Sequence, residues 1–271
     1  MIELDAQTLR ALQKTELELL IEVDRICKKC GIHYNIIAGT LLGAVRHGGF
    51  IPWDDDADVA MLRPEYEKFR KACETELDTS RFYFQDHRNT KGYRWGYGKL
   101  RRKDTVFLRE HQEHMPYEQG VFIDVFPLDG APDNYVKRCV HNFHCFLIRK
   151  IFWSAVGRFS DKNAFMRGVY GLLYKIPEQK IYGHYERFID KSNQIGKDWV
   201  RILTFPTPNR EYGYRRKWYE KSRKIAFEKI ELDGIADYDA YLTFKFGKYM
   251  ELPPEGQRKV HPVSDIKLLE E

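Results

Sequence analysis

The most informative part of the sequence lies between residues 39 and 58, which contain Gly39-Thr40-Leu41-Leu42-Gly43-Ala44-Val45 and then Trp53-Asp54-Asp55-Asp56-Ala57-Asp58. The second stretch places four carboxylates within five positions. Carboxylates at this density repel one another strongly wherever water is partly excluded, so a folded protein tolerates them chiefly beside a cation. Oxygen ligands of this kind suit a hard metal ion such as Mg²⁺ or Mn²⁺. The stretch therefore predicts a metal site.

Two of the four carboxylates are expected to share one face of a strand. Val59-Ala60-Met61 is apolar and strand-like, and Asp56 and Asp58 lie two positions apart where it begins. Side chains two positions apart on a strand project to the same face. Asp54 and Asp55 have an equally good alternative interpretation, because a solvated turn that opens the strand would contain the same residues.

A third acid stands alone in a strongly apolar segment. Residues 120–127 read Gly-Val-Phe-Ile-Asp-Val-Phe-Pro, and this run of β-branched and aromatic residues predicts a buried strand with Asp124 in its middle. A buried acid needs a partner. If this strand lies beside the one that carries Asp56 and Asp58, Asp124 becomes the third ligand of a shared metal centre. A salt bridge or a cap to a neighbouring loop is the alternative.

The glycine-containing stretch predicts an anion site. Residues 34–38 indicate a strand, and Gly39-Thr40 indicates a tight turn into a short helix. Glycine lets backbone approach a ligand closely, and the first amides of a helix point free N–H groups at whatever binds there, most naturally phosphate. Alone this signal is weak. Together with the Asp-x-Asp pair and Asp124, it completes the set of groups that phosphoryl or nucleotidyl transfer requires.

The other elements follow from periodicity and from start and stop signals. We expect an amphipathic helix from Ala6 to Cys30, ended by Gly31, and a second helix that Pro64 opens and that runs to about residue 77. Strands are expected at residues 82–84, 96–100 and 106–108, and helices for most of the chain after Asn134.

These motifs resemble a known family, the LicD family, whose relatives include the fukutin-related proteins and which is placed in the nucleotidyltransferase fold. The specific matches are AGTLLGAVRHGGFIPWDDDAD (residues 38–58), YGKLR (97–101) and FIDVFPLD (122–129). Looser similarity continues through residues 205–208, 212–213, 241–243, 246–250 and 261–262. The resemblance therefore covers nearly the whole chain, and it is weakest at residues 134–197.

The resemblance implies a fold and an activity. The implied fold is α/β, a nucleotidyltransferase-like mixed β-sheet core flanked by helices, with a mainly helical C-terminal elaboration. The implied activity is a metal-dependent transfer of a phospho-alcohol, in the best-known members phosphocholine from CDP-choline, to a hydroxyl of a cell-surface glycan precursor of the teichoic acid or lipopolysaccharide type, with release of CMP. The expected partners are a CDP-alcohol donor and a glycan acceptor, which can be lipid-linked.

The family's defining motifs correspond to Gly39 and Thr40, to Asp56 and Asp58, and to Asp124, so the resemblance carries the catalytic roles to these residues. Asp56, Asp58 and Asp124 are expected to bind Mg²⁺ or Mn²⁺, and Asp124 is also expected to take the proton from the attacking hydroxyl. Gly39 and Thr40 are expected to hold phosphate oxygens through their backbone amides.

Four basic residues are further candidates for phosphate contacts. They are Arg46, His47, Lys99 and Arg101. The alternative for His47 is a cap at the C-terminal end of a helix. Lys99 and Arg101 alternate along a strand that leads to the site, where they either pair with acids or hold the diphosphate.

Two rival functions stay open. The first keeps the chemistry but changes the cargo to ribitol phosphate, glycerol phosphate or ethanolamine phosphate. Choline recognition would need an aromatic cage, and the sequence has 17 Tyr and 17 Phe from which to build one. The second rival is a non-catalytic nucleotide-binding module, against which the presence of Asp56, Asp58 and Asp124 argues.

Length and composition favour a single domain. The chain has 271 residues, 43% of them hydrophobic, and no repeat or Gly/Ser linker divides it. We predict one domain over residues 1–271, with a catalytic core at about 1–133 and a helical part at about 134–271. The net charge of +5 is spread along the chain, which argues against nucleic acid as a partner and fits an anionic substrate or a membrane surface.

The sequence also indicates where the protein works. The first twenty residues mix acidic and basic with apolar positions, unlike a signal peptide, and no run of about twenty apolar residues occurs. Five cysteines without framework spacing fit a reducing compartment. We therefore expect a cytoplasmic protein, with peripheral contact to the inner face of the membrane as an option.

Two features have competing interpretations. Cys27 and Cys30, and later Cys139, His141, His144 and Cys145, have spacings that a zinc site could use, although core filling on helices is favoured. Residues 143–174 are apolar, aromatic and basic. They predict either buried helices or an interfacial surface where a lipid-carried glycan docks.

Overall fold

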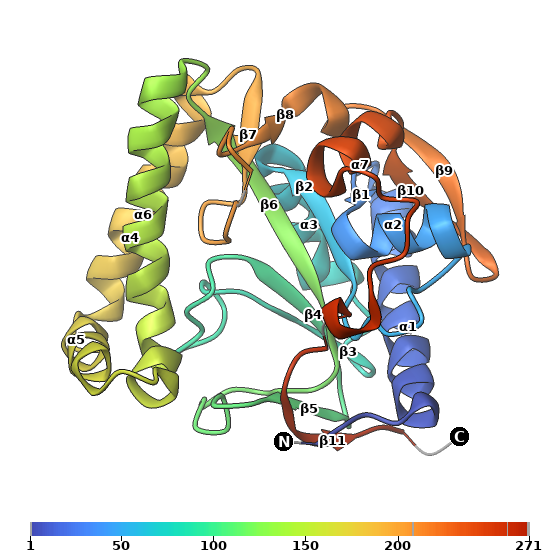
Figure 1. Cartoon of the computed structure of the whole chain (residues 1–271), viewed down its shortest axis with the longest axis horizontal. Coiled ribbons are helices and arrows are strands. Elements are labelled where there is room, and N and C mark those ends of the chain that lie inside the picture. Colours follow the sequence, from blue (N-terminus) through green and yellow to red (C-terminus); the bar gives the residue numbers. More distant parts are fainter. Residues whose placement is uncertain (1, 208, 259, 270–271) are drawn as a thin grey trace.

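A computed structural model describes residues 2–207, 209–258 and 260–269 of the chain. The centre of this part is a mixed β-sheet of nine strands that helices flank, with a separate two-stranded sheet near both termini (Figure 1). In chain order the strands are β1 (Asn35–Ile36), β2 (Asp58–Leu62), β3 (Phe82–Gln85), β4 (Gly98–Arg102), β5 (Val106–Arg109), β6 (Phe122–Ala131), β7 (Trp199–Arg201), β8 (Tyr214–Arg215), β9 (Ser222–Phe227), β10 (Ile230–Ile235) and β11 (Val263–Lys267).

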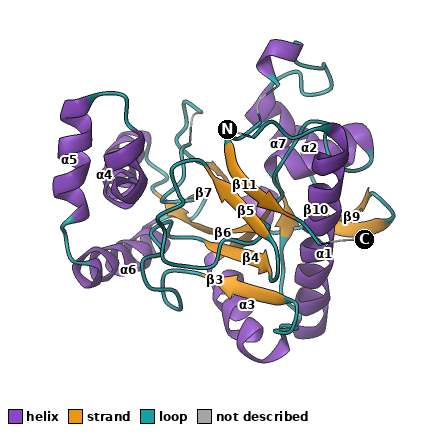
Figure 2. Cartoon of the chain, turned by 90° about the horizontal axis from the view of Figure 1, so that it is seen from below, coloured by secondary structure: helices purple, strands orange, loops and turns teal. Residues whose placement is uncertain are grey.

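The main sheet mixes parallel and antiparallel pairs, as predicted. Its strand order is β3-β4-β6-β2-β1-β10-β9, and β7 joins the end of β6 and pairs with β8. The pairs β2–β6 and β1–β10 are parallel, and the others are antiparallel. The small sheet pairs β5 with β11, so that the C-terminal strand lies beside the middle of the chain (Figure 2).

The helices of the described residues bury apolar stripes against the sheet or against one another. They are α1 (Ala6–Cys30), α2 (Ala38–His47), α3 (Arg63–Glu76), α4 (Tyr135–Ser160), α5 (Ala164–Tyr174), α6 (Glu178–Ile195) and α7 (Tyr238–Phe246), with 3₁₀ turns at Arg216–Tyr219 and Glu255–Gln257. Helices α1 and α3 pack on each other and on β2, β4 and β6. The predicted end of α1 is confirmed, because Gly31 adopts the left-handed conformation (φ 62°) that caps a helix there.

The predicted buried strand is confirmed as β6, but it continues past Pro127 to Ala131. Proline usually ends a strand because it has no N–H to donate. Here β4 pairs with β6 only up to Val125, and β7 begins to pair with it at Asp129. Pro127 therefore lies where this edge of β6 has no partner, and the sheet loses no hydrogen bond.

The prediction of helices through most of the chain after Asn134 holds only as far as Ile195. Beyond it lie β7 to β11 and α7. Strands β9 and β10 form a hairpin whose turn contains Glu228 in a left-handed conformation (φ 56°), and β10 then pairs with β1. The C-terminal part therefore completes the main sheet. The missed signal is the alternation of apolar and polar residues on both sides of this turn.

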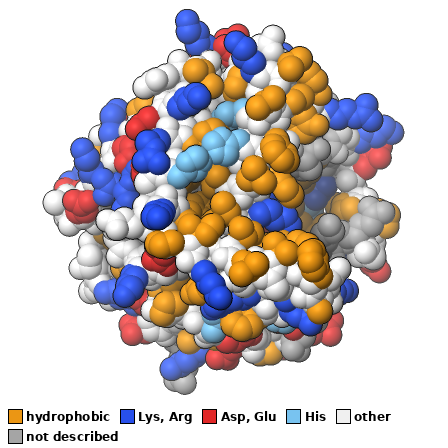
Figure 3. Space-filling model, turned by 90° about the vertical axis from the view of Figure 1, so that its left-hand side faces the viewer, with side chains coloured by type: hydrophobic (Ala, Val, Ile, Leu, Met, Phe, Trp, Pro, Cys, Tyr) orange, Lys and Arg blue, Asp and Glu red, His pale blue; other side chains and the backbone are white. Residues whose placement is uncertain are grey.

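Helices α4, α5 and α6 form a lobe beside the sheet with its own apolar core. Phe152 of α4 is 3% exposed and packs with Tyr185 of α6. The opposite side of the lobe exposes large apolar side chains, and Figure 3 shows them spread across this face among Lys, Arg and His. We call these residues the α4–α5 surface: Val136, Val140, Phe143, Phe146, Leu147, Phe159, Phe165 and Leu172.

One side of residues 143–174 is core, as the buried interpretation predicts, and the other side is exposed. The interfacial interpretation stays a prediction. Within the described residues, no helix is long and apolar enough to cross a membrane.

Candidate functional site

A row of polar residues crosses the main sheet at one level. Gln85 of β3, Lys99 of β4, Asp124 of β6 and Asp58 of β2 are successive register partners. Residues opposite one another on neighbouring strands project to the same face. The expected neighbourhood of the two acidic strands is therefore confirmed, and Asp58 and Asp124 share one face.

Lys99 binds Asp124 directly. The Lys99 Nζ lies 2.5 Å from Asp124 Oδ1 and 3.3 Å from the centre of the Phe122 ring. Lys99 is 6% exposed. Burial lowers the pKa of Lys99 to about 8, although the charge of Asp124 acts in the opposite direction. Asp124 Oδ2 makes no hydrogen bond with any described residue, so this oxygen is available to a ligand.

The surroundings of Asp54, Asp56 and Asp58 disfavour the charged forms of their carboxylates. Burial, and then the charges of Asp56 and Asp124, raise the pKa of Asp58 well above its ordinary range. Burial, and then Asp56 and Asp55, raise the pKa of Asp54 to about 8. Burial is also the main reason why the pKa of Asp56 is raised. A bound cation would remove this repulsion.

The donor chemistry of Asp56, Asp58 and Asp124 fits a hard divalent cation, because all the donors are carboxylate oxygens. The described residues contain no group of three or more His, Cys, Asp or Glu side chains that already stands in a ligating arrangement. One oxygen of Asp124 is engaged by Lys99. Binding such an ion would therefore require side-chain rotation around a shared face that the strands already provide.

The Gly39-Thr40 turn lies against these carboxylates at the start of α2. The Thr40 hydroxyl accepts a hydrogen bond from the backbone N–H of Asp58 at 2.8 Å, which ties the turn to the start of β2. A Cβ on Gly39 would lie 2.6 Å from Asp54 Oδ2, so any larger residue would displace the Asp54 carboxylate. No described acceptor bonds the amide N–H groups of Gly39 and Thr40. These amides are thus free for an anion, as the predicted role requires.

Asp55 binds two basic residues from distant parts of the chain. The sequence analysis had left its role open between the metal site and a solvated turn. Asp55 is 0% exposed, and its carboxylate receives Arg109 Nη1 at 2.6 Å and His261 Nδ1 at 2.9 Å. Burial would raise the pKa of Asp55, but the hydrogen bond from His261 and the charge of Arg109 outweigh it and leave the pKa below its ordinary value. Asp55 therefore fastens both β5 and the segment before β11 to the acidic loop, and it is not a solvated turn.

Glu16 is a sixth carboxylate of this region, and the sequence analysis missed it. It lies on α1, is 0% exposed, and neither side-chain oxygen has a hydrogen-bond partner among the described residues. Burial, followed by the charges of Asp56 and Asp55, raises the pKa of Glu16 well above its ordinary range. The available signal was an acid four positions from Leu12 and from Leu20, on the apolar side of the helix.

Three of the basic candidates have partners other than the site carboxylates. Arg46 and His47 lie in the last turn of α2, where Arg46 Nη1 donates to the carbonyl of Tyr249 at 2.8 Å. Arg101 donates to Gln85, at the end of the row, and to the carbonyl of Gly120, both at 2.7 Å. Of the four basic candidates, only Lys99 therefore binds a carboxylate of the row.

The acidic row opens into a cleft of about 360 Å³, which we call the carboxylate cleft. Its polar lining includes Asp56, Asp124, Lys99, Arg109 and His261. Four aromatic residues line its other side, and we call them the aromatic wall: Trp95, Tyr97, Trp153 and Phe205. The cleft thus joins carboxylates, cations and flat apolar surfaces in one space, as a ligand site does.

Comparison with known proteins agrees with this geometry. Residues 31–148 match the family model described as "LicD/FKTN/FKRP, nucleotidyltransferase domain". Over 276 residues, which are 97% of this chain and 98% of the relative, the chain is 27% identical to the lipopolysaccharide cholinephosphotransferase LicD of Haemophilus influenzae. Both similarities support the LicD family for this chain.

The chain also has shorter matches to two uncharacterized proteins. One, from Rickettsia typhi, is 41% identical over 54 residues, which are 20% of the chain and 18% of that protein. The other, from Rickettsia prowazekii, is 44% identical over 48 residues, which are 18% of each. The span that matches the family model contains all the predicted site residues, from Gly39 to Asp124, but not His261.

Three of the residues with zinc-like spacing, His141, His144 and Cys145, have partners within the helical lobe. His141 Nε2 is 2.9 Å from Ser192 Oγ, and Cys145 Sγ is 3.7 Å from His141 Nδ1. His144 pairs with His184 of α6 at 2.8 Å. These contacts join α4 to α6, which is the packing role that the sequence analysis favoured.

Proposed function

We propose that this chain is a metal-dependent transferase that moves phosphocholine from CDP-choline to a hydroxyl of a cell-surface glycan precursor of the lipopolysaccharide or teichoic acid type, and releases CMP. The observation that carries the proposal is the register of β2 and β6, which sets Asp58 opposite Asp124 beside the amide end of α2. The near-full-length similarity to a cholinephosphotransferase supports the choice of cargo.

Three carboxylates would hold the metal. Asp58 and Asp124 supply oxygen donors on one face of the sheet, and Asp56 lies in the loop just before β2 rather than on the strand as predicted. Mg²⁺ or Mn²⁺ bound by the three would neutralise the donor's diphosphate. The free amides of Gly39 and Thr40 would receive phosphate oxygens at the positive end of α2. Both groups act on the same diphosphate because the Thr40 hydroxyl fixes the turn to Asp58.

Asp124 would act as the base. Its Oδ2 takes the proton of the acceptor hydroxyl while the hydroxyl oxygen forms a bond to the choline-bearing phosphorus. The bond from that phosphorus to the bridging oxygen breaks, and CMP leaves with the electron pair. Lys99 holds the other oxygen of Asp124 and so fixes the orientation of the carboxylate.

The proposal includes contact between the α4–α5 surface and an anionic membrane at its cytoplasmic face. Helices α4 and α5 contain no Asp or Glu, and they carry Lys137, Arg138, Arg149, Lys150, Arg158 and Arg167. Exposed aromatic side chains among cations suit the headgroup region of an anionic bilayer. A lipid-linked acceptor would be within reach there.

A panel of donors tests the function. The purified chain is mixed with CDP-choline, CDP-ethanolamine, CDP-glycerol or CDP-ribitol, Mg²⁺, and lipopolysaccharide that lacks phosphocholine, and CMP release is measured. We expect the fastest release from CDP-choline and none in EDTA. A faster reaction with another donor would change the cargo, and donor binding without any CMP release would support the non-catalytic module.

A further inference from the structure

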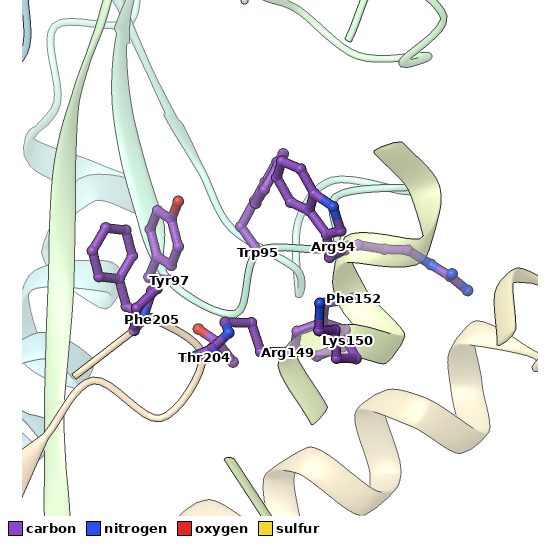
Figure 4. Close-up of a pocket in the computed structure, with 10 residues that line it drawn as sticks. Arg94, Trp95, Tyr97, Arg149, Lys150, Phe152, Thr204 and Phe205 are labelled. Atoms are coloured by element: carbon purple, nitrogen blue, oxygen red, sulfur yellow. The ribbon is translucent and has the colours of Figure 1, made fainter. Parts of the chain in front are cut away.

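A second cavity shares the aromatic wall with the carboxylate cleft. Its volume is about 320 Å³, and all four residues of the wall also line it. In Figure 4, Tyr97 and Phe205 lie side by side at one side of this cavity, while Arg149, Lys150 and Phe152 approach from α4. We call it the basic cavity.

The basic cavity contains cations without matching acids. No Asp or Glu lines it. Arg149 makes no hydrogen bond or ion pair with any described residue, and its guanidinium lies 5.6 Å from the centre of the Phe146 ring. Lys150 Nζ donates to the Tyr170 hydroxyl at 2.8 Å, a neutral partner. Two half-buried cations that share a cavity without a counter-charge favour an anion as the ligand.

The third cation that lines this cavity, Arg94, already has partners within the protein. Arg94 donates to Ser154 Oγ at 3.3 Å and to the carbonyl of Ile176 at 3.2 Å, and its Nε lies 3.7 Å from Glu178. Figure 4 shows its side chain extending away from Tyr97. Arg149 and Lys150 are therefore the groups left to bind the anion.

The aromatic wall adds a second kind of recognition. Trp95 and Trp153 meet edge to face with ring centres 5.8 Å apart, and Tyr97 and Phe205 do so at 6.2 Å. Such rings offer flat apolar faces, against which the C–H face of a sugar ring can pack. A trimethylammonium group would also favour aromatic rings, but Arg149 and Lys150 would repel its positive charge in this cavity.

We infer that the basic cavity is the acceptor subsite and takes a sugar phosphate, with the sugar ring on the aromatic wall and the phosphate between Arg149 and Lys150. This inference rests on the proposed function, because it assigns the donor to the carboxylate cleft. An acceptor hydroxyl on the wall would then face Asp124 from the opposite side to the bound phosphate. The phosphate can be a substituent of the sugar or its link to a carrier.

Calorimetric titration of the whole chain tests the inference with four probes: glucose 6-phosphate as a substituted sugar, glucose 1-phosphate as a linked sugar, methyl glucoside as a neutral sugar, and inorganic phosphate. We expect either sugar phosphate to bind more tightly than methyl glucoside or inorganic phosphate. The tighter of the two distinguishes the position of the phosphate. If no sugar phosphate binds better than the neutral sugar, the inference is wrong.

Three variants separate the two parts of the subsite. Arg149→Ala combined with Lys150→Ala should weaken the sugar phosphates by about tenfold or more and leave methyl glucoside unchanged. Trp153→Ala should weaken both sugars and leave inorganic phosphate unchanged. The matched control Arg187→Ala removes an exposed cation of α6 that does not line this cavity, and it should change nothing.

Titration of CDP with Mg²⁺ into the same variants keeps the two proposals apart. CDP affinity that falls together with sugar phosphate affinity in the Arg149 and Lys150 variant would assign the basic cavity to the donor and overturn the inference. If the protein binds CDP tightly and releases CMP but does not bind sugar phosphates, the inference is wrong and the proposed function stands. Sugar phosphate binding that depends on Arg149, in a protein that neither binds CDP nor releases CMP, would contradict the proposed function instead.

Discussion

The carboxylate cleft and the basic cavity share one aromatic wall and have similar volumes, about 360 and 320 Å³, but they differ in charge. Asp56 and Asp124 line the first, and Arg149 and Lys150 line the second without an acid. An acidic site attracts a metal ion and, through it, a diphosphate, whereas a basic site binds an anion directly. We therefore expect the donor diphosphate to bind in the carboxylate cleft through a metal ion. The acceptor phosphate is expected to bind in the basic cavity through Arg149 and Lys150.

The largest effect is expected at the acidic side. Asp58→Asn should abolish CMP release, because it removes the metal donor that stands opposite Asp124. In metal-free buffer the melting temperature should stay equal or rise, since a source of repulsion is gone. Activity assays and melting curves with and without Mg²⁺ measure both effects. Glu74→Gln, on the exposed side of α3, is the control. Wild-type turnover that survives EDTA would contradict the metal role.

A smaller loss is expected for Asp124→Asn. The amide keeps the shape of the side chain but cannot take the proton, so turnover should fall by roughly two to four decades. CDP binding with Mg²⁺ should weaken much less, because Asp56 and Asp58 remain. Single-turnover assays beside calorimetry separate the two quantities. Unchanged turnover would move the base to another carboxylate, and Asp54 is the next candidate.

Two adjacent residues of α4 that line the basic cavity, Phe152 and Trp153, are expected to differ in their contribution to stability. Phe152 is 3% exposed, so Phe152→Ala should cost about 3–5 kcal/mol of unfolding free energy. Trp153 is 37% exposed, so Trp153→Ala should cost far less while it weakens sugar binding. Urea unfolding of both variants measures the difference. Equal losses would mean that Trp153 belongs to the packed core and would weaken its role in the wall.

The acidic side could be predicted from the sequence because its signals are local. Asp56 and Asp58 sit at a strand start, Asp124 interrupts an apolar run, and glycine precedes a helix. The pairing of β2 with β6 followed from that pattern. Asp55, Arg109 and His261 could not be joined in this way, because their contacts link positions up to 206 residues apart. Arg149 carried no signal either, since a cation on a helix is ordinary until its surroundings are known.

The pKa of Asp54 predicts how the stability of the folded protein depends on pH. Burial, with Asp56 and Asp55, raises the pKa of Asp54 to about 8, so the folded protein holds this proton longer than the unfolded chain. The stabilising contribution is complete below about pH 4 and is lost as the pH rises to about 8. In EDTA the melting temperature should therefore decline over this range, and Asp54→Asn should flatten the decline. Added Mg²⁺ should do the same in the wild type. A decline that neither change alters would mean that other groups control it.

The smallest effect is expected for membrane contact on the basic side. Phe143 and Phe165 are exposed on helices that carry cations and no acids, so the chain should bind vesicles that contain anionic lipid. Binding should fade as salt is raised, because the ionic part is screened over about 8–10 Å. Replacing both residues with Ser should weaken co-sedimentation by a few-fold and leave the melting temperature unchanged. The same double change at Ile21 and Ile195, exposed apolar residues outside this surface, is the control. Vesicle binding that changes neither with salt nor with the Phe143 and Phe165 substitutions would contradict the proposed membrane contact. It would not affect the roles proposed for the two cavities.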